Sequence, residues 1–324
     1  METPLLEIKN LSVEFATEEG IVRAVNDLSL AVHEGENVAL VGESGCGKSV
    51  TAMSIPRLLP SSRVVQGEIL FQGKDLLKCS QEELRAIRGA GIGMVFQEPM
   101  TALSPLRKIG DQLTEGLHLH RDISHADARS LALEWLRRVG IPDPAARMDC
   151  FPFELSGGMR QRVMIAMALI LEPALLIADE PTTALDVTIQ AQILELLREQ
   201  IGKKTGLLLI THDLGVVWEM CSRIYVMYAS RIVETGDKES IFHHPRHPYT
   251  QGLLASMPSL HTGKERLPCI PGQVPSLRNL PQGCAFAERC PNRTDQCLNS
   301  PPPLMDGCAC FNQQGGIAKP HDCK

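Results

Sequence analysis

The chain has 324 residues, of which 44% are hydrophobic and 4% aromatic, enough for one large domain with an appendage or for two domains. Its formal net charge of −6 argues against nucleic acid as the main partner, because proteins that bind phosphate backbones usually carry a basic excess. No stretch approaches the roughly 18 apolar residues of a membrane span, and the N-terminus does not resemble a signal peptide, so we expect a cytoplasmic protein.

Apolar stretches alternate with amphipathic ones along most of the chain. This alternation predicts an α/β fold with a parallel sheet. Residues 174–181 and 207–213 are short and almost entirely apolar, as are strands buried inside parallel sheets. We expect further strands at 5–15 and 67–76, a strand, glycine-rich loop and helix over 35–59, helices at 125–141, 161–173 and 188–206, and a hairpin at 222–236.

The composition changes near Phe242, where a histidine- and proline-containing stretch begins and a Pro/Gly-rich run and a cysteine cluster follow. We therefore predict a first domain of residues 1–240 and a C-terminal extension of residues 241–324. The stretch 243–249 contains three histidines, but its two prolines disfavour a compact metal site, and a packed start of the extension is the preferred interpretation.

Residues 42–49, GESGCGKS, match the phosphate-loop pattern G-x-x-x-x-G-K-[ST] and follow an apolar stretch. Glycines let backbone N–H groups surround a phosphate, and the start of the next helix adds a positive dipole. Lys48 would supply charge to the β- and γ-phosphates, and the Ser49 hydroxyl would bind Mg²⁺. The predicted nucleotide contacts here are Gly42, Glu43, Ser44, Gly45, Cys46, Gly47, Lys48, Ser49 and Val50.

A second motif, ALLIADEP, ends an apolar run in two acidic residues. Asp179 at the strand end would bind Mg²⁺, and Glu180 would orient or deprotonate the attacking water. Alone, such a pair is more often a helix cap. Together with a phosphate loop it indicates hydrolysis of a nucleoside triphosphate.

Ser156, Gly157 and Gly158 precede an apolar helix and form a second candidate anion cradle, far in sequence from the first. One nucleotide does not need two complete cradles from one chain. The second cradle is therefore expected to serve a nucleotide held by another subunit.

With these motifs in order, residues 5–240 resemble the ATP-binding cassette (ABC) ATPases. LSGGMRQR matches the family signature, FQEP contains the Q-loop residue Gln97, ALD the D-loop residue Asp186, and ITHD the switch residue His212. The resemblance implies a P-loop ABC ATPase domain with a RecA-like core, a helical subdomain at about 97–158 and an antiparallel β subdomain. It also implies head-to-tail pairing of two cassettes around two ATP molecules.

The same resemblance implies roles for individual residues. Gln97 would contact Mg²⁺ or the attacking water, Glu180 would be the catalytic base, and His212 would contact the γ-phosphate. Asp186 would contact the nucleotide, and Ser156–Gly158 would face the partner's ATP.

Three features in or near the phosphate loop differ from the family pattern or are open to two interpretations. Val50 stands where the family often has Thr or Ser, which makes Thr51 a candidate substitute. The loop upstream lacks an aromatic residue to stack on adenine, so Phe15, Arg23 or aliphatic packing are the alternatives. Cys46 is either a small filler or, where the helix dipole lowers its pKa, an oxidisable thiol.

Stretches in the extension, HHPRHPYTQGLL, PGQVPSL and LPQGCAFAERCP, resemble the tails of ABC ATPases that import dipeptides, oligopeptides, D,D-dipeptides, nickel or glutathione. This implies an ATPase subunit at the cytoplasmic face of the inner membrane. Its partners would be a second ATPase chain, usually different, two membrane permeases and an extracytoplasmic solute-binding protein, with no nucleic acid.

The main alternative is a soluble ABC ATPase in DNA repair or translation. A single cassette without a long insert argues against it. A regulatory module that binds ATP without turnover is weakened by the presence of Glu180 and His212.

Six of the 11 cysteines follow residue 283, with the spacing C-x5-C-x6-C-x10-C-x-C for the first five. In a reducing compartment such clustering indicates metal or redox chemistry more than disulfides. The spacing lacks the close pairs of a zinc knuckle but is compatible with an iron–sulfur cluster. Zinc, and cysteines that stay reduced or form disulfides, are the alternatives.

Some members of the resembled subfamily carry a [4Fe–4S] cluster in this extension. Carried over, the resemblance implies Cys284, Cys290, Cys297 and Cys310 as ligands. Cys308 and Cys323 would then be dispensable.

Overall fold

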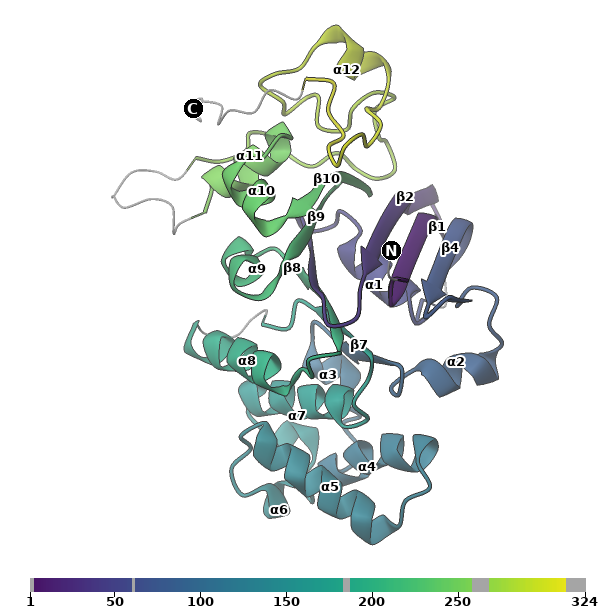
Figure 1. Cartoon of the computed structure of the whole chain (residues 1–324), viewed down its shortest axis with the longest axis vertical. Helices are drawn as coiled ribbons and strands as arrows, with labels where there is room; N and C mark the ends of the chain where they lie inside the picture. Colours follow the sequence, from purple (N-terminus) through teal and green to yellow (C-terminus); the bar gives the residue numbers. More distant parts are fainter. Residues whose placement is uncertain (1–2, 60–61, 183–186, 258–267, 313–324) are drawn as a thin grey trace. The chain divides into compact units, whose positions relative to one another are not determined.

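The computed structural model describes residues 3–59, 62–182, 187–257 and 268–312 (Figure 1). The chain divides into two compact units. We call them the signature unit, Met1–Leu5, Val32–Glu36 and Lys78–Leu209, and the P-loop unit, Leu6–Ala31, Asn37–Leu77 and Ile210–Lys324. Within the described ranges, no helix is both long and apolar enough to cross a membrane.

The signature unit combines short buried strands with helices. Its strands lie in the order β8-β7-β6, with β6 parallel to β7, and every residue of β7 and β8 is buried, as the apolar stretches 174–181 and 207–213 predict. The strands are β6 Ile92–Val95, β7 Leu175–Asp179 and β8 Gly206–Thr211, the last two residues of which, Ile210 and Thr211, already belong to the P-loop unit. The helices are α2 Gln81–Ile87, α3 Pro99–Ala102, α4 Ile109–His120, α5 His125–Arg138, α6 Pro144–Arg147, a 3₁₀ turn Pro152–Glu154, α7 Gly157–Leu169 and α8 Val187–Gln200.

The predicted amphipathic helices of this unit form close to the expected positions. Helix α5 begins after Ser124, whose hydroxyl accepts a hydrogen bond from the Asp127 N–H at 3.1 Å. Helix α7 begins at Gly157, earlier than the apolar pattern from residue 161 predicts, because Ser156 caps it and the two glycines form its first turn. Helices α4, α5 and α7 pack against one another.

The P-loop unit contains an antiparallel sheet in the order β2-β1-β4-β5. Strand β1 pairs with β4 in antiparallel register, with an irregularity between Lys9 and Ser12. Strand β2 was not predicted, because charged and polar residues interrupt its apolar pattern. The strands are β1 Leu6–Thr17, β2 Gly20–Val32, β4 Ser62–Phe71 and β5 Lys74–Asp75.

A second group of strands in this unit, β10-β9-β3, supports the phosphate loop. Strand β3, Asn37–Val41, runs parallel to β9, Arg223–Tyr228, and β9 pairs antiparallel with β10, Arg231–Asp237. The hairpin predicted at 222–236 is therefore present. Its two turn residues, Ala229 and Ser230, have φ of 43° and 73°, the positive values that match a tight turn to the strand twist.

Short helices and irregular chain complete the P-loop unit. The helices are α1 Lys48–Ser54, α9 Leu214–Met220, α10 Lys238–His243, α11 Pro248–Ala255 and α12 Asp295–Asn299. The C-terminal segment, residues 268–312, is mostly irregular in the described part of the chain. Tyr228, Tyr249 and Phe286 join β9, α11 and this segment, with ring centroids 4.6 to 5.5 Å apart.

Candidate functional site

The loop from Gly42 to Ser49 connects β3 to α1 and requires its glycines. Gly42, Gly45 and Gly47 have φ of 154°, 79° and 112°. A Cβ on Gly47 would lie 2.2 Å from the carbonyl oxygen of Ala24. The loop therefore follows a path that other residues avoid, and it packs closely against β2.

Lys48 is buried and its ammonium group lies inside the curve of the loop. Its Nζ donates hydrogen bonds to the carbonyl oxygens of Gly42 at 2.8 Å and Glu43 at 3.0 Å, and the residue is only 4% exposed. The hairpin turn also supports the loop, because the Ser230 N–H donates to the Cys46 carbonyl at 2.9 Å. The cation is thus positioned by the loop backbone itself.

Thr51 does not provide the hydroxyl that Val50 lacks. It is fully buried, and its hydroxyl donates to the Gly47 carbonyl oxygen at 3.0 Å within the helix. A hydroxyl in this bond is not available to a phosphate.

Cys46 is a packed residue of the loop. It is fully buried, and burial raises the pKa of its thiol, an effect that the nearby Lys48 only partly offsets. A thiol with a raised pKa carries little of the reactive thiolate. This favours the filler interpretation over the oxidisable one.

In the signature unit, Gln97 and Glu180 lie within hydrogen-bond distance. The Gln97 Nε2 donates to a Glu180 carboxylate oxygen at 3.2 Å. Glu180 follows the end of β7 and has φ of 45°, an uncommon value for this residue type. Asp179, the last residue of β7, is 2% exposed. Two motifs that are 83 positions apart are thus joined by one bond.

The serine and glycines of the second cradle form the start of α7. The Ser156 hydroxyl accepts a hydrogen bond from the Met159 N–H at 3.3 Å, and Ser156 and Gly157 are exposed. A Cβ on Gly157 would meet no atom of the described residues within 4 Å, whereas a Cβ on Gly158 would lie 3.3 Å from Ile189. In the part of the chain that the structure describes, no side chain covers the exposed N-terminus of α7 at Gly157.

Sequence reasoning missed Gln161, which joins α7 to the acidic motif. Its side-chain amide donates to the Pro181 carbonyl oxygen, directly after Glu180, and the residue is 2% exposed. The sequence feature that could have identified Gln161 is a lone side-chain amide in a helix that is otherwise largely apolar. Such a buried amide requires a partner.

His212 follows β8 in the P-loop unit and is exposed. The adjacent Asp213 caps α9, since its carboxylate accepts hydrogen bonds from the Gly215 and Val216 N–H groups at 2.8 and 3.3 Å. Asp186 lies outside the described residues.

Comparison with known proteins gives a family for both parts of the chain. The ABC transporter family matches residues 25–183, and the family of C-terminal regions of oligopeptide/dipeptide transporters matches residues 233–297. The dipeptide transport ATP-binding protein DppD of Bacillus subtilis is 54% identical over 297 residues, covering 90% of this chain and 88% of DppD. This chain belongs to the ATP-binding proteins of peptide ABC transporters.

Two further relatives of this peptide ABC family extend over most of the chain. The oligopeptide transport ATP-binding protein OppD of B. subtilis is 55% identical over 292 residues, covering 89% of this chain and 81% of OppD. The probable D,D-dipeptide transport ATP-binding protein DdpD of Escherichia coli is 49% identical over 322 residues, covering 97% and 98%.

Solved ABC cassettes share the fold. The dimeric structure of the bacterial ABC transporter cassette MJ0796 matches with a TM-score of 0.64 and 30% identity, covering 72% of this chain and 98% of that one. A post-hydrolysis structure of the same cassette with ADP and Pi matches with a TM-score of 0.65 and 29% identity over the same shares. The prediction of an ABC ATPase with a P-loop α/β fold is confirmed.

The histidines of residues 243–249 have separate environments in this family member. His247 is 2% exposed, its Nδ1 accepts a hydrogen bond from the Tyr249 N–H at 3.1 Å, and burial lowers its pKa to about 4. His243 is exposed and lies 3.3 Å from the Glu239 carboxylate. This arrangement is the packed start of the extension that the prolines favour.

The four cysteines singled out in the extension line one small cavity. Cys284, Cys290, Cys297 and Cys310 surround about 10 Å³ together with His247 and Phe286. Burial raises the pKa of the Cys284 thiol and raises that of Cys290 to about 11. Cys308 instead forms isolated backbone bridges with Glu234 and Met305.

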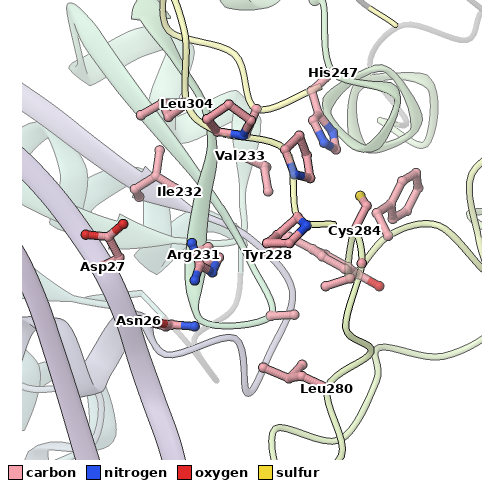
Figure 2. A pocket seen from close by; sticks show the side chains of 18 of the residues that line it. Asn26, Asp27, Tyr228, Arg231, Ile232, Val233, His247, Leu280, Cys284 and Leu304 are labelled. Atoms are coloured by element: carbon pink, nitrogen blue, oxygen red, sulfur yellow. The ribbon is translucent and has the colours of Figure 1, made fainter. Parts of the chain in front are cut away.

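A larger pocket of about 550 Å³ adjoins this cysteine cavity (Figure 2). Figure 2 shows His247 and Cys284 on one side of it and Asn26, Asp27 and Arg231 on the other. Cys284 therefore borders both cavities.

The cysteine cavity offers the donor atoms of an iron–sulfur cluster but not the room for one. Four free thiols converging on one cavity fit the donor set of such a cluster. The positions of the thiols in space do not fit a cluster, because the cavity has room for about one water. In the described ranges, no three His, Cys, Asp or Glu side chains are grouped as metal ligands. The residue types thus agree with a cluster and the present side-chain positions do not.

Proposed function

We propose that this chain hydrolyses ATP to power the import of dipeptides or oligopeptides through an ABC transporter. The observation that supports it most is similarity along both parts of the chain, with DppD 54% identical over 88% of its length and the transporter-type C-terminal region at residues 233–297. The relatives found are transport proteins, which disfavours the alternative of a soluble ATPase in DNA repair or translation.

Within this proposal, the phosphate loop holds the ATP phosphates. Its glycines expose backbone N–H groups, and Lys48 is already held inside the loop by two carbonyl oxygens. The proposed contacts are Gly42, Glu43, Ser44, Gly45, Cys46, Gly47, Lys48, Ser49 and Val50. His212 would contact the γ-phosphate.

The acidic motif supplies the base. Glu180 would accept a proton from the attacking water, and the 3.2 Å hydrogen bond from Gln97 supports a fixed orientation of its carboxylate. Ser49, Gln97 and Asp179 would hold Mg²⁺, which neutralises charge developing on the phosphates.

The exposed start of α7 supports a role in a second subunit's site. Ser156, Gly157 and Gly158, with Asp186, would contact ATP held by a partner cassette. The remaining proposed partners are two membrane permeases and an extracytoplasmic binding protein, which places this chain at the cytoplasmic face of the membrane. The domain division near residue 240, with a helical subdomain at 97–158, is part of the same proposal.

Co-purification tests this proposal directly. The chain, expressed with its genomic neighbours, should be isolated with two membrane permeases, and peptide with the binding protein should stimulate its ATPase activity. ATPase activity stimulated by DNA or by ribosomes, without permeases, would refute the importer assignment.

A separate test concerns the base. Glu180→Gln removes the proton acceptor but keeps the shape of the side chain, so ATP hydrolysis should nearly cease while ATP binding is retained. Glu172→Gln, which changes an exposed glutamate of the same unit, is the matched control. Wild-type turnover by Glu180→Gln would refute the base assignment.

For the C-terminal segment we propose that Cys284, Cys290, Cys297 and Cys310 take up a [4Fe–4S] cluster. Convergence of the four thiols on one cavity supports this, and the side chains would have to move apart to admit the cluster. Iron and acid-labile sulfide in anaerobically purified protein are the expected result. Zinc without iron, or protein free of both, would refute it.

A further inference from the structure

Glu43, the second residue of the phosphate loop, is held by the C-terminal segment. Its two carboxylate oxygens accept hydrogen bonds from Arg289 Nη1 at 2.9 Å and Nη2 at 3.2 Å, across 246 positions of sequence. Its backbone N–H donates to the Tyr249 hydroxyl at 2.9 Å, and its carbonyl oxygen accepts from Lys48 at 3.0 Å. Both the side chain and the backbone of Glu43 are therefore fixed.

Arg289 is built into its position. It is 8% exposed, its Nε donates to the Pro271 carbonyl oxygen at 2.9 Å, and its Nη1 also bonds the Tyr228 hydroxyl at 3.3 Å. Its guanidinium lies 5.7 and 5.9 Å from the ring centres of Tyr228 and Phe286. Burial alone lowers the pKa of Arg289, but its bonds to Glu43 and Tyr228 outweigh burial and raise it. The side chain is charged and bidentate, the geometry in which arginine pairs most strongly with a carboxylate.

The sign of the charge on Glu43 matters because of where it lies. An unpaired carboxylate inside a loop that surrounds phosphates would repel them, and screening is weaker at a partly buried position than in water. The Arg289 side chain is 7% exposed and that of Glu43 27%, so the pair is largely removed from solvent. Arg289 cancels the negative charge at this point of the loop.

We propose that Arg289 is a positioning residue for the ATPase reaction. By fixing and neutralising Glu43 it keeps the phosphate loop in shape and receptive to ATP, so nucleotide affinity depends on the C-terminal segment. Arg289 precedes Cys290 directly, which brings the stretch that lines the cysteine cavity into contact with the nucleotide loop. The inference rests on the proposed role of residues 42–49 in holding phosphates.

A Glu43–Arg289 ion pair that only stabilised the fold would lead to a different prediction. Loss of the pair would then lower the melting temperature of the variants without changing the ATP affinity of the molecules that remain folded. The charge role instead predicts a weaker ATP affinity that removal of the Glu43 charge restores.

The test is a double-mutant cycle in the full chain, with ATP affinity measured by calorimetry and KM and kcat measured by ATPase assay. Arg289→Gln should raise the Kd and KM for ATP about tenfold, because the Glu43 charge is left unbalanced. The kcat should change less than about twofold, since bound ATP is processed by other groups. The combined Glu43→Gln, Arg289→Gln variant should recover at least half of the lost affinity on a logarithmic scale, with Glu43→Gln alone completing the cycle.

Arg289→Lys covers the case in which Arg289→Gln does not fold, because it keeps the charge and loses only the two-pronged bond. It should bind ATP more weakly than wild type and, where both fold, more tightly than Arg289→Gln. Wild-type Kd in both Arg289 variants, or a combined variant no better than Arg289→Gln, would overturn the inference. Lys48→Ala distinguishes failure of the proposed phosphate loop from failure of the proposed role of Arg289. Retained ATP affinity in Lys48→Ala would refute the phosphate loop. A loss of ATP affinity in Lys48→Ala, with unchanged affinity in the Arg289 variants, would refute only the role of Arg289.

Discussion

The phosphate loop and the cysteine cavity lie in the same unit but are built from different kinds of sequence. The loop is eight consecutive residues, and its three positive-φ glycines and buried lysine define its shape locally. The cavity draws side chains from positions between His247 and Phe311, most of them on irregular chain. The first can be read from a motif, whereas the second exists only once the unit has folded. We therefore expect the ATP affinity to depend strongly on the loop residues and only weakly on the side chains that line the cavity.

The largest expected effect tests the loop side of this comparison. Lys48→Ala removes the cation held by the Gly42 and Glu43 carbonyl oxygens, so ATP affinity should fall at least about 30-fold, as expected for loss of one charged partner of a phosphate. Cys310→Ser, a single substitution in the cavity, should lower the ATP affinity less than about threefold. Equal losses in the two variants, measured by calorimetry, would erase the distinction between loop and cavity.

Two glycine substitutions test the packing of the phosphate loop. Gly47→Ala places a Cβ 2.2 Å from the Ala24 carbonyl oxygen and should cost about 3 kcal/mol of unfolding free energy or more. Gly45 also has positive φ, but a Cβ there would meet no atom of the described ranges within 4 Å, so Gly45→Ala should cost only backbone strain of about 1 kcal/mol. Urea unfolding of both variants gives the two values, and the reverse order would contradict the observed packing of the loop against β2.

The cavity side can be tested through His247. Burial lowers its pKa to about 4, against an ordinary value of 6.5, so between these values the unfolded state binds the extra proton. The stability that neutral His247 contributes is present above about pH 6.5 and is lost as the pH falls toward 4, by up to about 3 kcal/mol.

Urea unfolding at pH 7.5 and pH 5.0 measures this loss. His247→Gln should remove most of the pH dependence, while His244→Gln, which changes an exposed neighbour, should keep it. A wild-type stability that rises on acidification over this range would have the wrong sign.

The smallest expected effect is the reactivity of the loop thiol. Cys46 is fully buried and its pKa is raised by burial, so native protein should show almost no labelling of Cys46 by a thiol reagent. Cys150, which is only partly buried, is the internal reference, and both should label in urea. Labelling of Cys46 in native protein as fast as Cys150, followed by mass spectrometry, would restore the redox interpretation.

How far the sequence predicts this molecule depends on how local each feature is. The phosphate loop, the buried strands β7 and β8 and the β9–β10 hairpin follow from apolar runs and turn residues within a few positions. Strand β2 was missed because its polar residues break the alternation that marks a strand. The bond between Gln161 and Pro181 had a weak signal in a lone amide within an apolar helix.

Other features had no local signal at all. Nothing near Glu43 indicates that its partner is Arg289, because the pair forms only through the packing of the C-terminal segment. The resemblance pointed to Cys310 over Cys308, and the cavity contains Cys310, yet spacing alone does not determine which thiols converge. The raised thiol pKa values likewise come from burial, which a motif does not encode.

The central claim, that this chain's ATP hydrolysis drives peptide import, is tested most directly by transport. Vesicles carrying the assembled transporter, with ATP on the side of this subunit, should take up a labelled dipeptide delivered by the binding protein. The account predicts ATP-dependent uptake with the wild-type chain and almost none with Glu180→Gln. Uptake at the wild-type rate with Glu180→Gln, or uptake that does not require ATP, would contradict it.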